Sequence, residues 1–499
     1  MPIHRERTSI LRALCAGIGL SIAAAHADTT APIDPALQPD EIRALTKDAF
    51  FWGMQQVGFY ELRYQFTQNE RNPAFRGVNR VQRNRQLFTA KQRFATTPNA
   101  STLYSGGSFD LSREPVLVDA AAVTDDRYWS IQAADQYAHW FFFVGSPFTG
   151  NGAQRYLIIG PDWHGRLPAG LRATQVVRAP SNAVTMTLRL AVKNVDSAAD
   201  LAAAGKIMDG VFMTPLSVWE NNGRRPVAPE KQPIVKGEYR SFPRMADIAD
   251  LTKSMTPLDY LQLASLVIND ASMTKRSDSV KEVQTLQRLA RLGLREGYLF
   301  DPAAVSAAQK QAIEQGFLEA RAEARRAVDS GLLDMNGWKL QTSLFYDEND
   351  YVLRAGAAEI AWGSPVPFES HTIGFGLVDA DGKTLDGSHA YTLTFAVDQL
   401  PPVTDFWEMP LYDDYGYFVD NPINRYSVTS YQLQNGALQV QDGKLTLYLQ
   451  STKPADPAQA RNWLPTPASG VFRLAPRFYG PTSPLIDGSY AMPKIVRVR

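Results

Sequence analysis

The residue types best suited to binding a small molecule form three blocks near the C-terminal end. Residues 406–407, 421–427 and 462–465 combine aromatic rings, turn-forming Asn and Pro, and one guanidinium. Aromatic walls with a few fixed amide and guanidinium donors are typical of small-molecule sites. The same types also form structural corners, in which Asn caps turns and Arg ties strands together. Both interpretations stay open for the candidate substrate-binding residues Asn424, Arg425, Asn462 and Trp463.

Two polar groups in the N-terminal half could also do chemistry. In residues 98–105, Asn99 follows a proline and can hold a turn, and Tyr104 then enters a strand. In residues 132–140, Asp135 and His139 stand among aromatic residues and could form an acid/base pair if they face a cleft. The structural alternative, which we favour, is that Asp135 caps a bend and His139 lies at a strand edge.

Metal, nucleotide and common hydrolase chemistry have little support in the sequence. No two histidines after the N-terminal segment share a short ligand spacing, so a metal site would have to be assembled from distant residues such as His371 and His389. The sequence has no Gly-x-Ser-x-Gly elbow, no Gly-x-Gly-x-x-Gly after a strand and no phosphate loop. We therefore expect neither a metal nor a cofactor.

Length and composition bound the class of protein. With 499 residues, the chain is long enough for two or three domains. The 51 basic and 51 acidic residues cancel, which leaves no basic field to hold nucleic acid. Many Tyr, Phe and Trp residues together with 32 prolines suit a β-rich protein with many turns.

The N-terminus has the pattern of an export signal. His4, Arg5, Arg7 and Arg12 form a charged region, residues 13–25 are apolar or small, and residues 25–27 fit a small-x-small cleavage site before Asp28. The apolar run is too short to span a bilayer, and no later segment reaches the length required. We expect a periplasmic or secreted protein. Since the single cysteine, Cys15, lies inside this signal, the mature chain would contain no thiol chemistry.

Hydrophobic periodicity divides the remaining chain. After the signal (1–27), we expect an N-terminal leader and helix (28–86), an N-terminal β domain (87–222), a linker and helical segment (223–350) and a C-terminal β domain (351–499). Within the helical segment, the pattern predicts helices that begin at Pro257 and cover 277–296 and 302–329. The predicted fold is mainly β with a helical insert (α+β): two jelly-roll or sandwich-like β units bridged by helices.

Specific motifs in both β units resemble known families. Residues 97–99, 102–105, 111–115, 127–129, 159–163 and 167–170 are similar to the uncharacterised domain family 1254. Residues 381–387, 406–413, 421–427, 462–465 and 487–488 look like its usual partner, domain family 1214. The resemblance covers most of the mature chain in the order typical of these tandem proteins. It implies a β-rich, two-unit architecture with a helical segment and little chemistry, because neither family has a known function.

This chain departs from the usual motif of each family at one place. Ser101 stands where the usual Pro-Asn-x-Asp-Thr-Leu-Tyr-Ser motif carries Asp, and Glu408-Met409-Pro410 interrupts the usual Phe-Trp-Ser-x-Thr-x-Tyr-Asp. If that Asp has a role in relatives, this chain has lost the role or moved it to Glu408.

Two function hypotheses follow. The first is an exported enzyme of the hydrolase or lyase type that acts on a small or sugar-like substrate in an inter-domain cleft. Its proton-transfer groups would be Asp135, Glu408 or Tyr104, and its substrate-binding residues would be Asn99, His139, Asn424, Arg425, Asn462 and Trp463. The second is a non-catalytic periplasmic or envelope protein that binds a small-molecule or carbohydrate ligand or serves as a structural homo-oligomer subunit.

Overall fold

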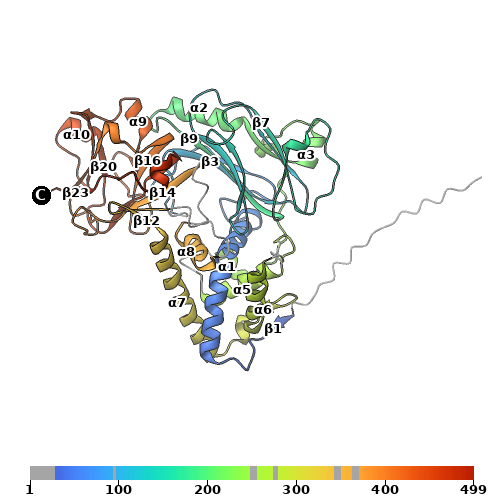
Figure 1. Cartoon of the computed structure of the whole chain (residues 1–499). Helices are drawn as coiled ribbons and strands as arrows, with labels where there is room; N and C mark the ends of the chain where they lie inside the picture. The colour runs from blue at the N-terminus through green and yellow to red at the C-terminus, as the bar shows by residue number, and fades with distance from the viewer. Residues whose placement is uncertain are drawn as a thin grey trace, which may run out of the picture.

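The computed structural model describes residues 29–93, 97–247, 255–273, 279–341, 350–361 and 370–498. The predicted signal peptide lies outside the described residues. Two β units stand side by side, and a layer of helices lies beneath both of them (Figure 1). The predicted mixed α+β class with two β units is therefore confirmed.

The N-terminal unit is a sandwich of two sheets. The five-stranded sheet has the order β2-β3-β9-β5-β6 and is antiparallel. Its strands are β2 (Gln82–Asn84), β3 (Thr102–Asp110), β5 (Trp129–Asp135), β6 (Trp140–Gly145) and β9 (Ala183–Ala191). The four-stranded sheet contains β4 (Val116–Ala120), β7 (Gln154–Ile159), β8 (Val176–Arg178) and β10 (Val211–Pro215).

Alternation along the strands decides what each face of the five-stranded sheet carries. Leu103, Ile131 and Leu188 point into the sandwich core against the four-stranded sheet. The residues of the opposite parity form the other face, which we call the polar face. It carries Thr102, Tyr104, Ser108, Ser130, Gln132, Thr185, Thr187 and Arg189.

The C-terminal unit is a second sandwich. One sheet has seven strands: β12 (Leu333–Met335), β13 (Trp338–Leu340), β14 (His371–Gly376), β16 (Val403–Asp413), β17 (Ser427–Thr429), β21 (Phe472–Leu474) and β22 (Arg477–Pro481). The other has five: β15 (Tyr391–Ala396), β18 (Val440–Gln441), β19 (Lys444–Gln450), β20 (Trp463–Pro465) and β23 (Ile495–Arg497). Trp407, Leu411 and Leu447 are buried between them.

The helical layer is built from two distant parts of the chain. Helix α1 (Pro39–Thr67) packs against α5 (Pro257–Ile268), α6 (Val280–Leu289), α7 (Ala307–Gly331) and α8 (Tyr351–Ala361). The ring of Phe50 on α1 lies 5.9 Å from Tyr260 and 5.0 Å from Phe317, which fixes the centre of this core. The N-terminal helix thus joins the helical segment, and residues 351–361, which we expected in the C-terminal β domain, do so as well.

Local sequence explains where these helices begin. Thr256 caps α5, with Pro257 at the first helical position as predicted. Helix α7 begins later than expected, at Ala307, because Ser306 caps it and Pro302 starts a separate short turn. None of the described helices is long and apolar enough to cross a bilayer.

Short elements complete the fold and connect these layers. They are β1 (Thr30–Ala31), β11 (Leu299–Phe300), α2 (Ala198–Asp209), α3 (Leu216–Asn221), α9 (Ser430–Gln434), α10 (Pro457–Arg461) and α11 (Ser483–Ile486).

Candidate functional site

Strand β16 places an acid between the two sandwiches. Trp407 and Met409 point into the C-terminal core, so alternation directs Phe406 and Glu408 to the opposite face of the sheet. There Phe406 packs with Tyr128 of the N-terminal unit. The seven-stranded sheet therefore faces the N-terminal sandwich with polar and aromatic residues.

Glu408 is fully buried at this contact and is held from both units. Its cross-strand neighbour in the C-terminal sheet is Arg477. From the N-terminal unit, Asn99 donates through Nδ2 to one carboxylate oxygen, and the backbone N–H of Ala100 donates to the other at 3.1 Å. Asn99 also donates to the hydroxyl of Tyr479 at 2.8 Å. The candidate acid Glu408 thus reaches the turn next to Ser101.

Arg477 links the same turn to the C-terminal sheet. Its Nη1 donates to the Tyr412 hydroxyl at 2.6 Å, and Tyr412 donates in turn to the carbonyl of Pro98. Its Nη2 donates to the carbonyl of Thr97, a residue held at φ 48°. A β-branched residue rarely adopts this left-handed backbone. We call Asn99, Glu408, Tyr412, Arg477 and Tyr479 the Glu408 cluster.

The electrostatics of the Glu408 cluster favour a structural role for its acid. Burial raises the pKa of Glu408, and the nearby charge of Arg477 opposes part of that rise. Since Glu408 has no exposed surface and several donors satisfy its oxygens, no substrate can reach it without rearrangement. Its position fits a group that fastens the two units together.

A second network runs from the Glu408 cluster onto the polar face. Arg189 donates to the side-chain oxygen of Gln132, and Gln132 donates to the hydroxyl of Ser370. The Ser370 hydroxyl lies 3.2 Å from Nδ1 of His371. The imidazole of His371 stacks on Tyr479 of the Glu408 cluster with 5.1 Å between ring centroids.

Arg189 and His371 of this second network, together with Tyr104 opposite Arg189 on β3, keep some exposed surface, unlike Glu408. Tyr104, Arg189 and His371 are half-buried. Burial, together with the positive charges of Arg189 and Arg477, lowers the pKa of His371 well below its usual value, so the imidazole is neutral at neutral pH. Burial likewise raises the pKa of Tyr104, which keeps its phenol protonated. We call Tyr104, Arg189 and His371 the accessible triad.

The predicted pair Asp135 and His139 lies at the far end of β5. The Asp135 carboxylate accepts the backbone N–H groups of Tyr137 and His139, each at 2.9 Å, and so caps the bend as the structural alternative predicted. The His139 Nδ1 is 3.5 Å from the same carboxylate. Close by, Tyr137 donates to Glu282 of the helical layer at 3.1 Å. Asp135 thus holds the β5–β6 turn in shape, and Tyr137 ties this turn to the helices.

The C-terminal blocks form a corner at which polar side chains serve the backbone. Nη1 of Arg425 donates to the carbonyls of Arg461 and Trp463 at 2.8 and 3.0 Å. Asn462 is buried and bonds the backbone of Gln439 and Thr446. The exposed Asn424 accepts from Tyr426 at 3.1 Å, and the Trp463 indole donates to the Gln450 carbonyl at 2.7 Å. Arg425 therefore lies in this corner, where it bonds the carbonyls on either side of Asn462.

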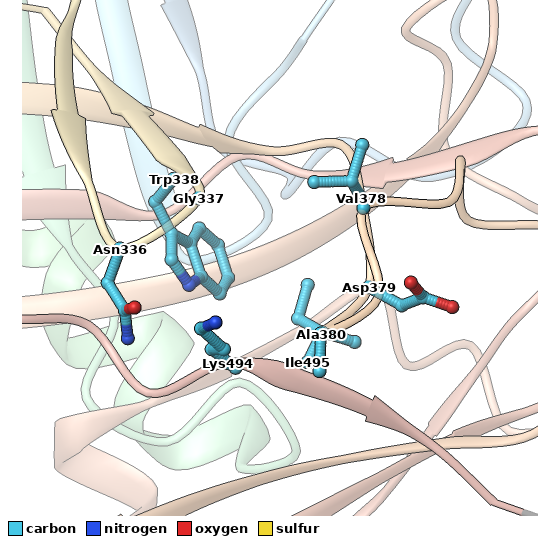
Figure 2. A pocket seen from close by; sticks show the side chains of 9 residues that line it. Asn336, Gly337, Trp338, Val378, Asp379, Ala380, Lys494 and Ile495 are labelled. Carbon is cyan, nitrogen blue, oxygen red and sulfur yellow. The ribbon is translucent and has the colours of Figure 1, made fainter.

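A hollow of about 230 Å³ lies on another part of the C-terminal unit. Figure 2 shows the Trp338 ring on one side of it and Val378 and Ala380 on the other, with the Asp379 carboxylate turned away. The polar groups around it serve the backbone, since Trp338 donates to Pro493 and Asp379 accepts from Lys383. With its acid turned away and its indole N–H occupied, this hollow is a weaker candidate than the polar face.

The described residues contain no group of three or more His, Asp or Glu side chains arranged to hold a metal. His371 belongs to the network beside Tyr479, whereas His389 pairs with Arg497 at 3.0 Å on the surface. The two histidines therefore belong to different networks.

Sequence reasoning missed the residues that matter most here. Arg189 and Arg477 lie in ordinary-looking strand sequence, and His371 drew attention only as a metal ligand. The available signal was parity: Arg477 and Tyr479 flank Phe478, which is a core residue. Alternation therefore places Arg477 and Tyr479 on the face away from the core, and only the structure shows that the N-terminal unit covers this face.

Two protein-family models match the regions that contain the motifs noted in the sequence. The model described as "Protein of unknown function (DUF1254)" matches residues 78–215, and "Protein of unknown function (DUF1214)" matches residues 373–483. The chain carries these two domains in tandem. The first match spans the N-terminal sandwich, and the second spans most of the C-terminal one. The Glu408 cluster is thus part of the contact between DUF1254 and DUF1214.

One solved structure supports the fold. The crystal structure of the VPA0106 protein from Vibrio parahaemolyticus is 22% identical, with a TM-score of 0.61, and the match covers 92% of this chain and all of that one. An uncharacterised protein from Burkholderia cenocepacia is 12% identical with a TM-score of 0.40, covering 92% of this chain and 95% of that one. None of the curated proteins matches the sequence significantly.

Proposed function

We propose that this tandem DUF1254–DUF1214 protein binds a small anionic molecule on the polar face, where the two domains meet. The observation that carries the proposal is Arg189. Its guanidinium is half-buried, donates to the amide oxygen of Gln132 and lies 5.7 Å from the Trp140 ring centroid. Among the described residues, no carboxylate pairs with Arg189. A guanidinium removed from water without an acid partner favours an anionic ligand.

The surroundings of Arg189 support a carboxylate or a similar anion. The neutral His371 and the protonated Tyr104 are both able to donate a hydrogen bond. With the acid of Glu408 enclosed behind Asn99, the accessible groups add no negative charge to this part of the face. Domain contacts are also favoured places for ligand sites.

A thermal-shift series tests the proposal. The mature chain is heated with acetate, benzoate, gluconate or phosphate, and stabilisation by the bound anion should rise with the logarithm of its concentration. Arg189→Met should remove this stabilisation. Arg178→Met is the matched control, because Arg178 lies in the same domain and donates to backbone carbonyls. Equal shifts in wild type and Arg189→Met would refute the proposal.

A hydrolase or lyase activity is a second proposal, and it rests on the neutral imidazole of His371. A half-buried neutral histidine beside a phenol and a guanidinium has the make-up of a general base with an anion clamp. In this version Tyr104 and His371 transfer protons, while Glu408 holds the two domains in place. Turnover of any ligand found in the thermal screen, lost in both Tyr104→Phe and His371→Gln but kept in Tyr156→Phe, would support it.

Export to the periplasm or the medium is a third proposal, and it rests on residues 1–27 alone. The mass of the protein recovered from the periplasmic fraction should correspond to a chain beginning at Asp28. A mass that includes Met1 would refute it.

A further inference from the structure

The polar face carries three buried hydroxyl groups without a hydrogen-bond partner among the residues that the structure describes. They belong to Thr102, Ser108 and Thr185, which are 0%, 2% and 7% exposed. Ser108 and Thr185 are direct cross-strand neighbours on β3 and β9. All three lie on the same side of the sheet as Arg189.

Helix α1 brings further unpaired polar atoms to the same region. Neither amide atom of Gln56, which is 1% exposed, has a partner among the described residues, and the same is true of the side-chain oxygen of Gln55. Gln56 follows Trp52 by one turn and precedes Arg63 by two, so the three share a helix face.

The neighbours of this helix face locate Gln56 relative to the sheet. Trp52 donates to Glu282, which also accepts from Tyr137 just beyond β5. Arg63 donates to Ser272, whose carbonyl accepts the N–H of Ala183 at the start of β9. Gln56 therefore lies between the end of β5 and the start of β9, which is the end of the sheet that carries Thr185.

Such a concentration of unpaired groups needs an explanation. Buried hydroxyl and amide groups cost free energy unless they are hydrogen-bonded, and most native structures pair them. Here the groups of Ser108, Thr185 and Gln56 come from three elements and gather at one end of one sheet face, whereas Thr102 lies at the other end of the same face. A guest rich in hydroxyl groups would satisfy both the donors and the acceptors among them.

We propose that the ligand is a hydroxylated carboxylic acid of the sugar-acid class, which rests on the proposed function. Its carboxylate pairs with Arg189, and its hydroxyl groups reach Ser108, Thr185 and Gln56. Arg189 and Thr185 are four residues apart on β9, so the two rows of cross-strand neighbours to which they belong are about 13 Å apart. The Arg189 side chain covers part of this span, because its guanidinium lies 5.7 Å from the ring of Trp140, a residue in the row of Thr185.

Calorimetric titration with three probes separates the two chemical groups. Gluconate carries a carboxylate and hydroxyls, hexanoate carries only the carboxylate, and sorbitol carries only the hydroxyls. The mature chain should bind gluconate at least tenfold more tightly than hexanoate, and sorbitol more weakly than gluconate. Equal affinities for gluconate and hexanoate would overturn the sugar-acid inference.

Two substitutions locate the hydroxyl contacts. Thr185→Val and Ser108→Ala should each weaken gluconate binding about tenfold, the effect of about one lost hydrogen bond, and leave hexanoate binding unchanged. Without ligand, Thr185→Val should melt at the same temperature as wild type or higher, because the lost hydroxyl has no partner in the protein. Thr394→Val, whose hydroxyl pairs with Thr446 in the other domain, is the control and should not alter binding.

These experiments distinguish failure of the sugar-acid inference from failure of the anion site on which it rests. If Arg189→Met abolishes binding of both acids while Thr185→Val and Ser108→Ala change nothing, the anion site stands and the sugar-acid inference fails. If gluconate binds equally to wild type and Arg189→Met, the anion site itself fails. If no acid binds and sorbitol does not either, both are overturned, and the unpaired groups hold ordered water only.

Discussion

The C-terminal corner and the polar face contain similar residue types but use them differently. In the corner, Arg425 and Asn462 bond backbone groups of nearby segments of the same domain. On the polar face, Arg189 bonds another side chain, and the network continues across the domain contact to Ser370 and His371. Donors bonded to backbone are committed to the fold, whereas side-chain networks with exposed members stay available to a ligand.

This comparison shows that residue types alone do not distinguish a ligand site from a structural corner. The corner looked like a pocket because it concentrates aromatics, amides and a guanidinium. Apart from Tyr104, the polar face was not recognised from the sequence, because its polar residues alternate with core residues as in any half-buried strand. Strand pairing, which places Arg189 opposite Tyr104 and Ser130, is what turns dispersed residues into one surface.

The largest effect should come from breaking the pair that fastens the domains. Arg477→Met removes the charge next to the buried Glu408 and should lower the free energy of unfolding by about 3–5 kcal/mol. Urea unfolding measures it. The double variant with Glu408→Gln should recover part of the loss, since the uncompensated charge is gone. A loss below about 1 kcal/mol in the single variant would show that the pair does not hold the domains.

The next largest effect should come from the corner. Asn462→Ala removes a buried side chain that bonds three backbone groups, so the free energy of unfolding should fall by about 2–3 kcal/mol. Gluconate affinity, measured below the new melting temperature, should equal that of wild type. Loss of binding with little loss of stability would make the corner part of the ligand site.

A smaller effect is expected from Arg425→Lys. The ammonium keeps the charge but lies on a shorter side chain than the Nη1 that bonds two carbonyls, so these bonds should weaken and cost about 1 kcal/mol. The same substitution at the polar face, Arg189→Lys, should change stability less and anion affinity more. This crossed pattern of unfolding and titration results separates the two regions. Identical patterns for the two variants would erase the distinction.

The smallest effect concerns pH. The pKa of His371 is lowered in the fold, so the unfolded chain binds this proton more readily, and stability falls as pH drops below about 6.5. His371→Phe keeps an aromatic ring on Tyr479 but cannot be protonated. Its free energy of unfolding should therefore fall less between pH 7 and pH 5 than that of wild type. Parallel pH curves for the two proteins would contradict a buried neutral imidazole.

The sequence predicted the architecture better than the site. Periodicity located α1, α5 and the two β units, and Pro257 at the first helical position predicted the start of α5. It did not reveal that α1 and α8 share one helical layer with α7, because this packing depends on residues about 300 positions apart in sequence. Asn99, Tyr104 and Glu408 were named as candidates, but their partners Arg477 and Tyr479 come from a strand pairing that no local pattern encodes.

The most direct test is to locate the ligand in a crystal of the mature chain grown with saturating gluconate. The account predicts difference density on the polar face, with the carboxylate within hydrogen-bond distance of Arg189 and a hydroxyl next to Thr185. Density at the corner around Arg425 or in the hollow beside Trp338, with an unchanged polar face, would contradict it.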